Sequence, residues 1–455
     1  MVDIPRQTAL RALLAMEATH GRPDAVISRL CAENGLHGRD RAFVSELCHG
    51  ALRHMRALDF ILSHGSGRPA QSMDTPVLAI LRMGMYQALG MDRARFAAVN
   101  ESVELAKSWK KTSRAAGFVN AALRQSLRSI DRAGGKEMTI WEVAKLLQPE
   151  GLPPARRLGE QYSFPDYWVA RWVENFGEAT TERILAGCQA KSPLYIRLNI
   201  PVYTSSQVAK LLGDNSIEAK PVAWDEGLLQ VTDGVLPPDS PLITDGVVQP
   251  QDAASYLASR LLAPGKEDTV ADVCCGKGIK SGLFAQLAAK VMAFDLNPSS
   301  LISLKKNMAR QKIGNVYPIL ADMTRLWPVR GEFSRIFVDA PCSGSGLARR
   351  HPEGKWRKSV ELIEKMSRIQ SELLAGAVEF LAPGGELVYA ICSVEPEEGR
   401  DNVEKLLKSD KSLIRVRASA RNPRLFDFET ETGDMLILPG MHDMDGFFAS
   451  VIRKK

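Results

Sequence analysis

The sequence has few cysteines, and their spacing is not that of structural cysteines. Its 455 residues include 7 cysteines, an odd number, and no two of them form a C-x-x-C pair. This pattern argues against a disulfide framework, a structural zinc site and a thiol redox enzyme. We therefore expect free thiols, each either buried or reactive, and no bound metal. The cysteines are Cys31, Cys48, Cys188, Cys274, Cys275, Cys342 and Cys392.

Long apolar runs are absent as well. Nowhere do about 18 apolar residues follow one another without a charge, so we expect no membrane-spanning helix and no membrane partner. Residues 1–24 have apolar side chains at helical spacing but no continuous apolar core before a small-residue cleavage site. We therefore expect a cytoplasmic protein. Its 45% hydrophobic and 25% charged residues are typical of folded chains, and its length predicts about two to four domains.

The N-terminal part of the chain is basic and has the spacing of a helical domain. Residues 1–134 hold 19 Lys and Arg against 12 Asp and Glu, whereas the whole chain has a net charge of only +6. Apolar residues recur at helical intervals, as at Val77, Ile80, Leu81 and Met85, which predicts five to seven helices. The charge by itself fits an alkaline helical surface as well as a nucleic-acid-binding one.

Four segments of this region resemble the NusB-like RNA-binding fold in their order and spacing. They are RDRAFVSELCHGALRH (39–54), ILRMGMYQALGM (80–91), AAVNESVELAK (97–107) and GFVNAALR (117–124). The resemblance implies an all-α NusB-like RNA-binding domain over residues 1–134.

Residues 135–247 predict a linker and a small α+β subdomain. A proline-bearing stretch leads into a helix expected at residues 166–176, and SPLYIRLNIP (192–201) has the composition of a strand. Arg197 in that strand is a candidate phosphate contact, with a surface ion pair as the alternative.

From Val248 onward, short β-rich runs alternate with helical segments. Such alternation predicts a doubly wound parallel sheet with helices on both faces, in which ligands bind at the carboxyl ends of the strands. We therefore expect the chemistry of this domain, residues 248–455, in the residues that follow each strand. The expected strands are TVADVC, KVMAFDLN, NVYPILAD, RIFVDAP and ELVYAICSV.

The first of these strands ends in a glycine-containing turn, DVCCGKGIKS (272–281), and Asp295 closes the next strand. Such a turn lets backbone N–H groups approach a nucleotide-like ligand, while the later acidic residue accepts hydrogen bonds from ribose hydroxyls. The chain has no G-x-G-x-x-G and no G-x-x-x-x-G-K-[ST] sequence, which disfavours dinucleotide and triphosphate ligands. An adenosyl cofactor fits the pattern better.

Two cysteines follow the last two of these strands, in DAPCSGSG (339–346) and ICSVEPEEG (391–399). A lone cysteine is usually a core residue, but two that both lie in strand-end turns point to a site. Pro341 and Gly344 indicate an irregular first turn, and Pro396 is expected to begin the helix after the second.

These sequences resemble a known family. DAPCSGSGLARRHPEGKW (339–356), the C-S-V-x-P-E-E sequence and LPGMHDMDGFF (438–448) are similar to the RsmB/Sun/Fmu-type bacterial 16S rRNA cytosine-5 methyltransferases. The resemblance covers nearly the whole chain. It implies a Rossmann-like class I methyltransferase domain after the small α+β subdomain, with S-adenosylmethionine as cofactor. It also implies a monomer that methylates RNA, expected to be 16S rRNA, and not DNA.

The resemblance assigns roles to particular residues. Carbon 5 of cytosine is a poor nucleophile, so the Cys392 thiolate is expected to add first at carbon 6. Asp339 is placed at N3 of the base, and Cys342 is expected to serve the removal of the carbon-5 proton. The cofactor contacts implied are Cys274, Cys275, Gly276, Lys277, Gly278, Ile279, Lys280, Asp295 at the ribose, Asp322 beside the adenine, and Asp339 near the methionine moiety.

The cofactor loop departs from the family's D-x-C-A-A-P-G-G-K-T. Lys277 replaces the usual Pro, and Ile279 replaces the second Gly. A β-branched residue is costly where φ is positive, so either the loop does not need a positive φ there or cofactor affinity is reduced. Lys277 is a candidate partner for the cofactor carboxylate.

Basic residues with one tryptophan follow the Cys342 turn. Such a mixture suits an RNA strand that delivers one base to a pocket, and a solvated charged loop is the alternative. The residues are Arg349, Arg350, His351, Lys355, Trp356, Arg357 and Lys358. Two other functions stay open from the sequence: a tRNA cytosine-5 methyltransferase, and a non-catalytic RNA-binding or assembly factor with an inactive cofactor loop.

Overall fold

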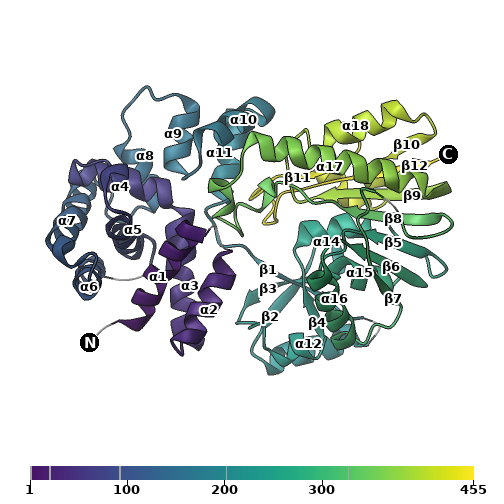
Figure 1. The fold of residues 1–455 in the computed structure, drawn as a ribbon, viewed down its shortest axis with the longest axis horizontal. Helices are drawn as coiled ribbons and strands as arrows, with labels where there is room; N and C mark the ends of the chain where they lie inside the picture. The colour runs from purple at the N-terminus through teal and green to yellow at the C-terminus, as the bar shows by residue number, and fades with distance from the viewer. Residues whose placement is uncertain (1–2, 20–21, 92–93, 201, 326) are drawn as a thin grey trace. The chain divides into compact units, whose positions relative to one another are not determined.

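The computed structural model divides the chain into two compact units (Figure 1). One comprises Met1–Gln189 with His351–Arg357 and is helical, and the other comprises Ala190–Arg350 with Lys358–Lys455 and is built on two sheets. The structure describes residues 3–19, 22–91, 94–200, 202–325 and 327–455.

Helices α1 to α8 of the helical unit pack around one apolar core. Seven α-helices lie in the described part of residues 1–134, which confirms the helical prediction, and four more follow before residue 189. Their bounds are α1 Ile4–Thr19, α2 Pro23–Glu33, α3 Gly38–Arg53, α4 Met55–Ser66, α5 Thr75–Gly90, α6 Arg95–Ser108, α7 Ala116–Arg132, α8 Ile140–Leu147, α9 Pro154–Gln161, α10 Asp166–Phe176 and α11 Glu178–Gly187, with short 3₁₀ turns at Ala70–Ser72, Ser113–Ala115 and Gly354–Trp356.

The helix expected at residues 166–176 is α10, with the same bounds. It begins after Pro165, whose fixed φ suits a helix start, and ends at Gly177, whose φ of +79° interrupts the helical backbone. Trp168 and Trp172 lie four residues apart on its buried face, with their rings edge to face at 5.9 Å. Helical spacing of large apolar side chains thus fixes which side of α10 faces the core.

A small antiparallel sheet opens the second unit. Its strand order is β2-β3-β1-β4, and the strand expected within residues 192–201 is β1. The elements are β1 Leu194–Leu198, α12 Ser205–Asp214, β2 Glu218–Val222, β3 Asp225–Asp233, α13 Pro241–Thr244 and β4 Val248–Pro250.

The large sheet has the order β10-β12-β9-β8-β5-β6-β7, with β11 paired to β12. Its five strands from β5 to β9 pair in parallel, which confirms the predicted doubly wound arrangement. The elements are α14 Ala253–Arg260, β5 Thr269–Val273, α15 Ile279–Ala285, β6 Lys290–Asp295, α16 Pro298–Arg310, β7 Val316–Leu320, β8 Phe333–Asp339, α17 Val360–Glu379, β9 Leu381–Ile391, α18 Arg400–Ser409, β10 Leu413–Val416, β11 Met435–Ile437 and β12 Phe447–Lys454, with 3₁₀ turns at Ser345–Leu347, Ala418–Ala420 and Pro423–Phe428.

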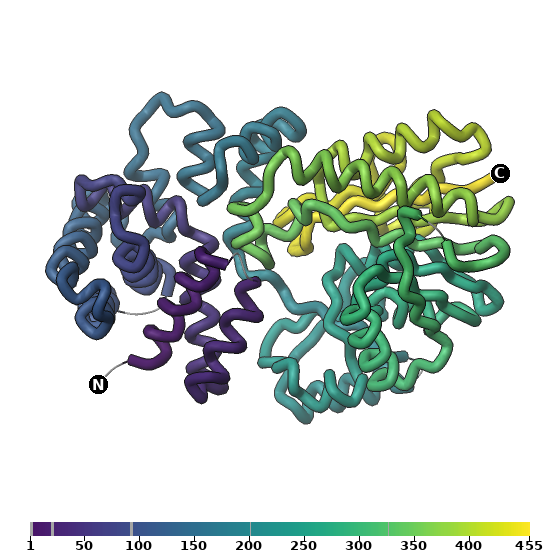
Figure 2. The backbone as a smooth tube through the Cα atoms, in the orientation of Figure 1, coloured from purple at the N-terminus to yellow at the C-terminus, as the bar shows by residue number. Residues whose placement is uncertain are grey.

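Helices cover both faces of this sheet, so its central strands are almost wholly apolar. In β8, Ile336, Phe337 and Val338 are all fully buried although they point to alternate faces. Helix α15 packs against β5 and β6, and α17 packs against β8 and β9 (Figure 1). The C-terminal strand β12, yellow in Figure 2, lies inside the sheet between β9 and β10. The parallel strands therefore present their carboxyl ends at one edge.

One polar residue, Asp272, interrupts the apolar interior of β5. It is fully buried, and its Oδ2 accepts a hydrogen bond from the Ser281 hydroxyl at 2.5 Å, whereas its Oδ1 has no partner among the described residues. Burial, reinforced by the charge of Asp339, raises the pKa of Asp272 to about 7, although the Ser281 hydrogen bond lowers it.

No helix within the described ranges is both long and apolar enough to cross a membrane.

The raised pKa of Asp272 predicts a pH-dependent stability. The folded state holds this proton more tightly than the unfolded state, so the free energy of unfolding falls as the pH rises from about 4 to about 7. Asp272→Asn keeps the shape without the titration. In urea unfolding, the wild type should lose up to about 4 kcal/mol relative to this variant across that window. The exposed Asp233→Asn serves as the control, and a parallel pH dependence of wild type and Asp272→Asn would contradict the prediction.

Candidate active site

The loop after β5 is tied to the end of β6. Cys275 donates its N–H to the carbonyl of Phe294 at 2.9 Å, and Gly278 donates its N–H to the carbonyl of Cys275 at 3.0 Å. The Gly276 N–H donates to Oδ2 of Asp295 at 2.8 Å. The loop and Asp295, both predicted to contact the cofactor, therefore form one hydrogen-bonded unit.

The strained backbone of this loop is at Cys274 and not at Ile279. Gly276 and Gly278 have φ of +55° and +76°, and Cys274 has φ of +61°, which is rare for a residue with a side chain. Ile279 begins helix α15 and is not among the residues with positive φ. The loop therefore needs no glycine at 279, and the departure from the family sequence causes no backbone strain there. The contact of Lys277 with a cofactor carboxylate stays a prediction.

Four carboxylates surround this loop. Asp272 lies in β5, Asp295 and Asp339 are the last residues of β6 and β8, and Asp322 follows β7 by two residues. Burial raises the pKa of Cys274, and the charges of all four carboxylates raise it further. The edge of the sheet is therefore an acidic wall that favours a cationic ligand.

Lys280 is the cation that the loop itself contributes. Its Nζ donates to Oδ2 of Asp339 at 2.6 Å and lies 6.0 Å from the centre of the Phe447 ring. Burial lowers the pKa of Lys280, but the charge and hydrogen bond of Asp339 outweigh it, so the pKa is raised. Lys280 is thus charged and holds the Asp339 carboxylate in place.

The two predicted catalytic cysteines lie in contact. Sγ of Cys342, after β8, is 3.0 Å from Sγ of Cys392, after β9. The hydrogen bond with Cys392, followed by burial, raises the pKa of Cys342 well above its usual value. The structure therefore brings together both cysteines at one sheet edge. No group of three or more His, Cys, Asp or Glu that could hold a metal ion occurs in the described part of the chain.

The sequence did not predict the contact of Lys358 with the first cysteine turn, and it placed the start of the helix after the second turn too early. Lys358 donates from Nζ to the carbonyl of Gly344, whose φ of +67° makes the first turn irregular, as expected. Burial lowers the pKa of Lys358 despite the nearby cysteines. The expectation that Pro396 begins a helix is wrong, because the chain makes a turn there and α18 starts at Arg400.

The residues at this edge fit S-adenosylmethionine. Asp295 and Asp322 each accept local hydrogen bonds, from the N–H of Asn297 and from the N–H and hydroxyl of Thr324, and carboxylate oxygens have further lone pairs for ribose or amine donors. No atom lies within 4 Å of a Cβ placed on Gly276, so the loop is open there. The acidic wall suits a molecule that carries a sulfonium and an ammonium group.

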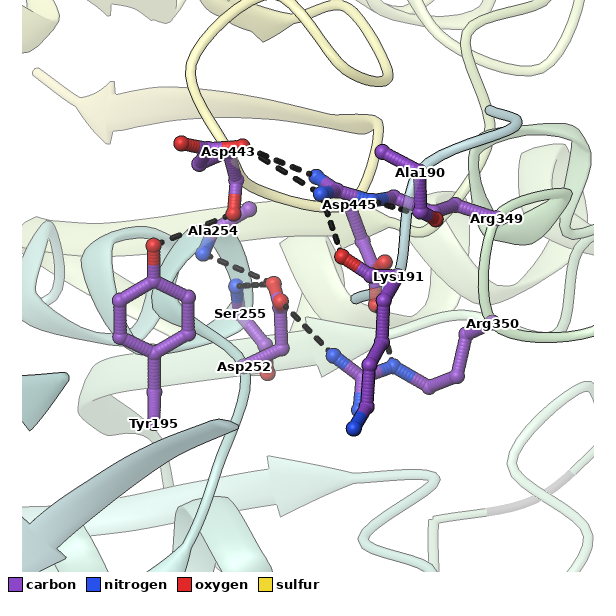
Figure 3. Close-up of polar contacts among 10 residues, drawn as sticks. All are labelled: Ala190, Lys191, Tyr195, Asp252, Ala254, Ser255, Arg349, Arg350, Asp443 and Asp445. Carbon is purple, nitrogen blue, oxygen red and sulfur yellow. Dashed lines mark hydrogen bonds and ion pairs between the residues drawn. The ribbon is translucent and has the colours of Figure 1, made fainter. Parts of the chain in front are cut away.

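The first two arginines after the Cys342 turn, Arg349 and Arg350, are held by partners within the same unit. Arg349 is 3% exposed and donates to the carbonyls of Ala190 and Lys191, and it also pairs with Asp443 (Figure 3). Arg350 bridges carboxylates of the same cluster, which includes Asp252 and Asp445. The prediction that Arg349 contacts RNA is therefore wrong, because it is buried among internal partners, whereas the side chain of Arg350 is 37% exposed and its contact with RNA stays a prediction.

Lys355 is buried as well, whereas His351 and Arg357 are exposed and their contact with RNA stays a prediction. Lys355 is 2% exposed, donates to the carbonyl of Arg53 and lies 4.4 Å from the centre of the Phe164 ring within the helical unit. Burial lowers the pKa of Lys355 to about 7. Arg197, a candidate phosphate contact, is 1% exposed beneath α15, so that prediction is wrong too.

Family comparisons identify the parts of the chain. The 16S rRNA methyltransferase RsmB/F family matches residues 259–453, the NusB family matches residues 3–128, and an RsmF/B-like ferredoxin-like domain matches residues 164–235.

Curated relatives extend over nearly the whole chain. Ribosomal RNA small subunit methyltransferase B of Vibrio cholerae is 29% identical over 90% of this chain and 88% of its own length. The probable ribosomal RNA small subunit methyltransferase B of Synechocystis sp. is 28% identical over 99% of each chain. The crystal structure of PH0851 shares the fold with a TM-score of 0.78 at 21% identity, covering 100% of this chain and 99% of that one. Residues 259–453 therefore match the RsmB/F family, and the chain as a whole is similar to S-adenosylmethionine-dependent rRNA methyltransferases.

Proposed function

We propose that this enzyme transfers a methyl group to carbon 5 of a cytosine in 16S rRNA. The observation that carries the proposal is the pair of thiols, Cys342 and Cys392, 3.0 Å apart beside an acidic cofactor loop. The names of the curated relatives support ribosomal RNA as the substrate. We further propose that it acts as a monomer in the cytoplasm, with RNA as its macromolecular partner.

The first chemical step belongs to Cys392. Its thiolate adds to carbon 6 of the cytosine, and the electron pair of the carbon 5–carbon 6 double bond shifts onto carbon 5 and, through carbon 4, toward N3, so that carbon 5 becomes nucleophilic. Asp339, held by Lys280, lies at the same strand edge and protonates or hydrogen-bonds N3 as charge develops on the ring. S-adenosylmethionine, when bound, supplies the methyl group that carbon 5 takes up.

The second step belongs to Cys342. Its thiolate accepts the proton on carbon 5, the electrons of that C–H bond restore the double bond to carbon 6, and the Cys392 sulfur leaves with its bonding pair. The raised pKa keeps Cys342 protonated in the resting enzyme, so its thiol must first release that proton, and the thiolate then formed is a strong base for the carbon-5 proton. The contact between the two sulfurs allows both to reach adjacent carbons of one base.

The cofactor is proposed to lie along the ends of β5, β6 and β7. The loop from Cys274 to Lys280 supplies N–H groups, Asp295 faces the ribose, and Asp322 lies beside the adenine. Asp339 would then lie near the methionine moiety as well as near the base. In this arrangement the acidic edge of the sheet binds the positively charged cofactor.

The two cysteines predict different outcomes on a denaturing gel. Cys392→Ala should form no covalent complex with substrate RNA and should have no activity. Cys342→Ala should also be inactive but should accumulate a slowly migrating protein–RNA band, because nothing removes the carbon-5 proton. The buried thiol variant Cys48→Ala is the control and should retain turnover. A band with Cys392→Ala would reverse the assignment of the two sulfurs.

The substrate is tested by bisulfite sequencing of RNA from a strain that lacks this protein. We expect 5-methylcytosine to disappear from a single position of 16S rRNA and to return with the wild-type protein but not with Cys392→Ala. A loss confined to tRNA would favour the tRNA methyltransferase alternative. No loss in any RNA would favour the non-catalytic RNA-binding alternative.

A further inference from the structure

Glu398 is a charged side chain in the interior of the catalytic unit that the chemistry above does not use. It is fully buried in the turn between Cys392 and α18. A buried carboxylate is costly unless donors satisfy it. Four donors do so here: the Ser343 N–H at 2.7 Å and the Gln370 side-chain amide at 3.0 Å on Oε1, and the hydroxyls of Ser343 and Ser393, each at 2.5 Å, on Oε2.

These donors come from the two cysteine turns and the helix behind them. Ser343 immediately follows Cys342, and Ser393 immediately follows Cys392. Gln370 lies in α17 and also donates to the carbonyl of Pro341, which precedes Cys342. One carboxylate therefore binds the residue next to each catalytic sulfur.

The surrounding contacts hold this carboxylate in turn. The Tyr389 hydroxyl and the Asn402 side-chain amide both donate to the carbonyl of Glu398. Ser345 links the turns once more, since its hydroxyl lies 3.0 Å from that of Ser393 and accepts the N–H of Val394 at 3.0 Å. The side chains of this network are buried and largely satisfied by one another, which makes the network rigid.

We propose that Glu398 is a positioning residue that clamps the two cysteine turns together, so that both sulfurs reach the same base. This inference rests on the two-cysteine function proposed above. Glu398 touches neither sulfur itself and acts through the serine that follows each one. Charge-assisted hydrogen bonds to the carboxylate are stronger and shorter than neutral ones, so they resist separation of the turns.

Removing the carboxylate should affect turnover without affecting cofactor binding. In Glu398→Ala, the Ser343 N–H, two hydroxyls and one amide lose their acceptor, and the turns are free to shift. Misplacement of a reacting group by about 1 Å costs roughly 10²-fold in rate, so kcat should fall by about that factor. The dissociation constant of S-adenosylmethionine, measured by calorimetry, should stay within about twofold, because Asp295 and Asp322 lie at the ends of β6 and β7, whereas the cysteine turns follow β8 and β9.

A direct measurement is the rate at which diamide joins the two sulfurs. Diamide takes one hydrogen from each thiol, and the Cys342–Cys392 bond that forms is counted by mass spectrometry of the linked peptides. Because this rate reports how often the sulfurs meet, it should fall at least about tenfold in Glu398→Ala. The measurement needs no methyl transfer, so it tests the clamp even if the proposed reaction is wrong.

Glu386→Ala is the matched control. Glu386 is also a buried carboxylate, but it lies in the first half of β9 and pairs with Arg453. Its loss should lower stability without changing the cross-linking rate. Should Glu398→Ala fail to fold, Glu398→Gln keeps the shape and should lower kcat and cross-linking by smaller factors. Wild-type cross-linking in either folded Glu398 variant, or an equal fall in Glu386→Ala, would overturn the proposal.

Discussion

Parallel pairing of β5 with β8 and of β8 with β9 is the constraint on which the rest of this enzyme depends. Because parallel strands end on the same edge, residues separated by more than a hundred positions arrive together there. Asp272 and the cofactor loop come from the first strand, Asp339 and Cys342 from the second, and Cys392 from the third. The apolar residues that bury these strands on both faces therefore also build the site.

Polar groups at this edge are held by a few buried contacts. Lys280 fixes Asp339 on the cofactor side, and Glu398 joins the two cysteine turns on the base side. Glu398 is fully buried, where a charged hydrogen bond is strong and an unpaired charge is costly, and Lys280 is largely buried. The positions of Asp339 and of the two sulfurs thus depend on Lys280 and Glu398, which do not contact the base in our mechanism.

The sequence predicted the elements whose pattern is local. The helical period of the N-terminal part, helix 166–176 and the five β-rich runs all correspond to elements of the structure, and strand-end turns identified both cysteines. Burial was not predictable in this way. Arg349 has the sequence context of an RNA-binding residue, but its partner Asp443 lies 94 positions away, so the sequence does not show that the charge is internal. Arg197 and Lys355 were misread for the same reason.

Glu398 is a residue whose importance the sequence did not reveal. The C-S-V-x-P-E-E sequence drew attention to Cys392, but only the three-dimensional contacts relate Glu398 to Ser343, 55 positions earlier. Pro396 was predicted to start a helix from local preference, whereas the structure uses these positions for the turn that carries Glu398. Tertiary hydrogen bonds outweigh the local helix signal there.

The central claim is that Cys392 attacks carbon 6 and that removal of a carbon-5 proton releases the product. It is tested most directly with 16S rRNA transcribed with 5-fluorocytidine, because fluorine at carbon 5 cannot leave as a proton does. Wild-type enzyme with S-adenosylmethionine should then remain covalently bound to the RNA. Mass spectrometry of the digested complex should find the modified nucleotide on the peptide that contains Cys392. A nucleotide on the Cys342 peptide, or no covalent complex with an enzyme that methylates normal RNA, would contradict the account.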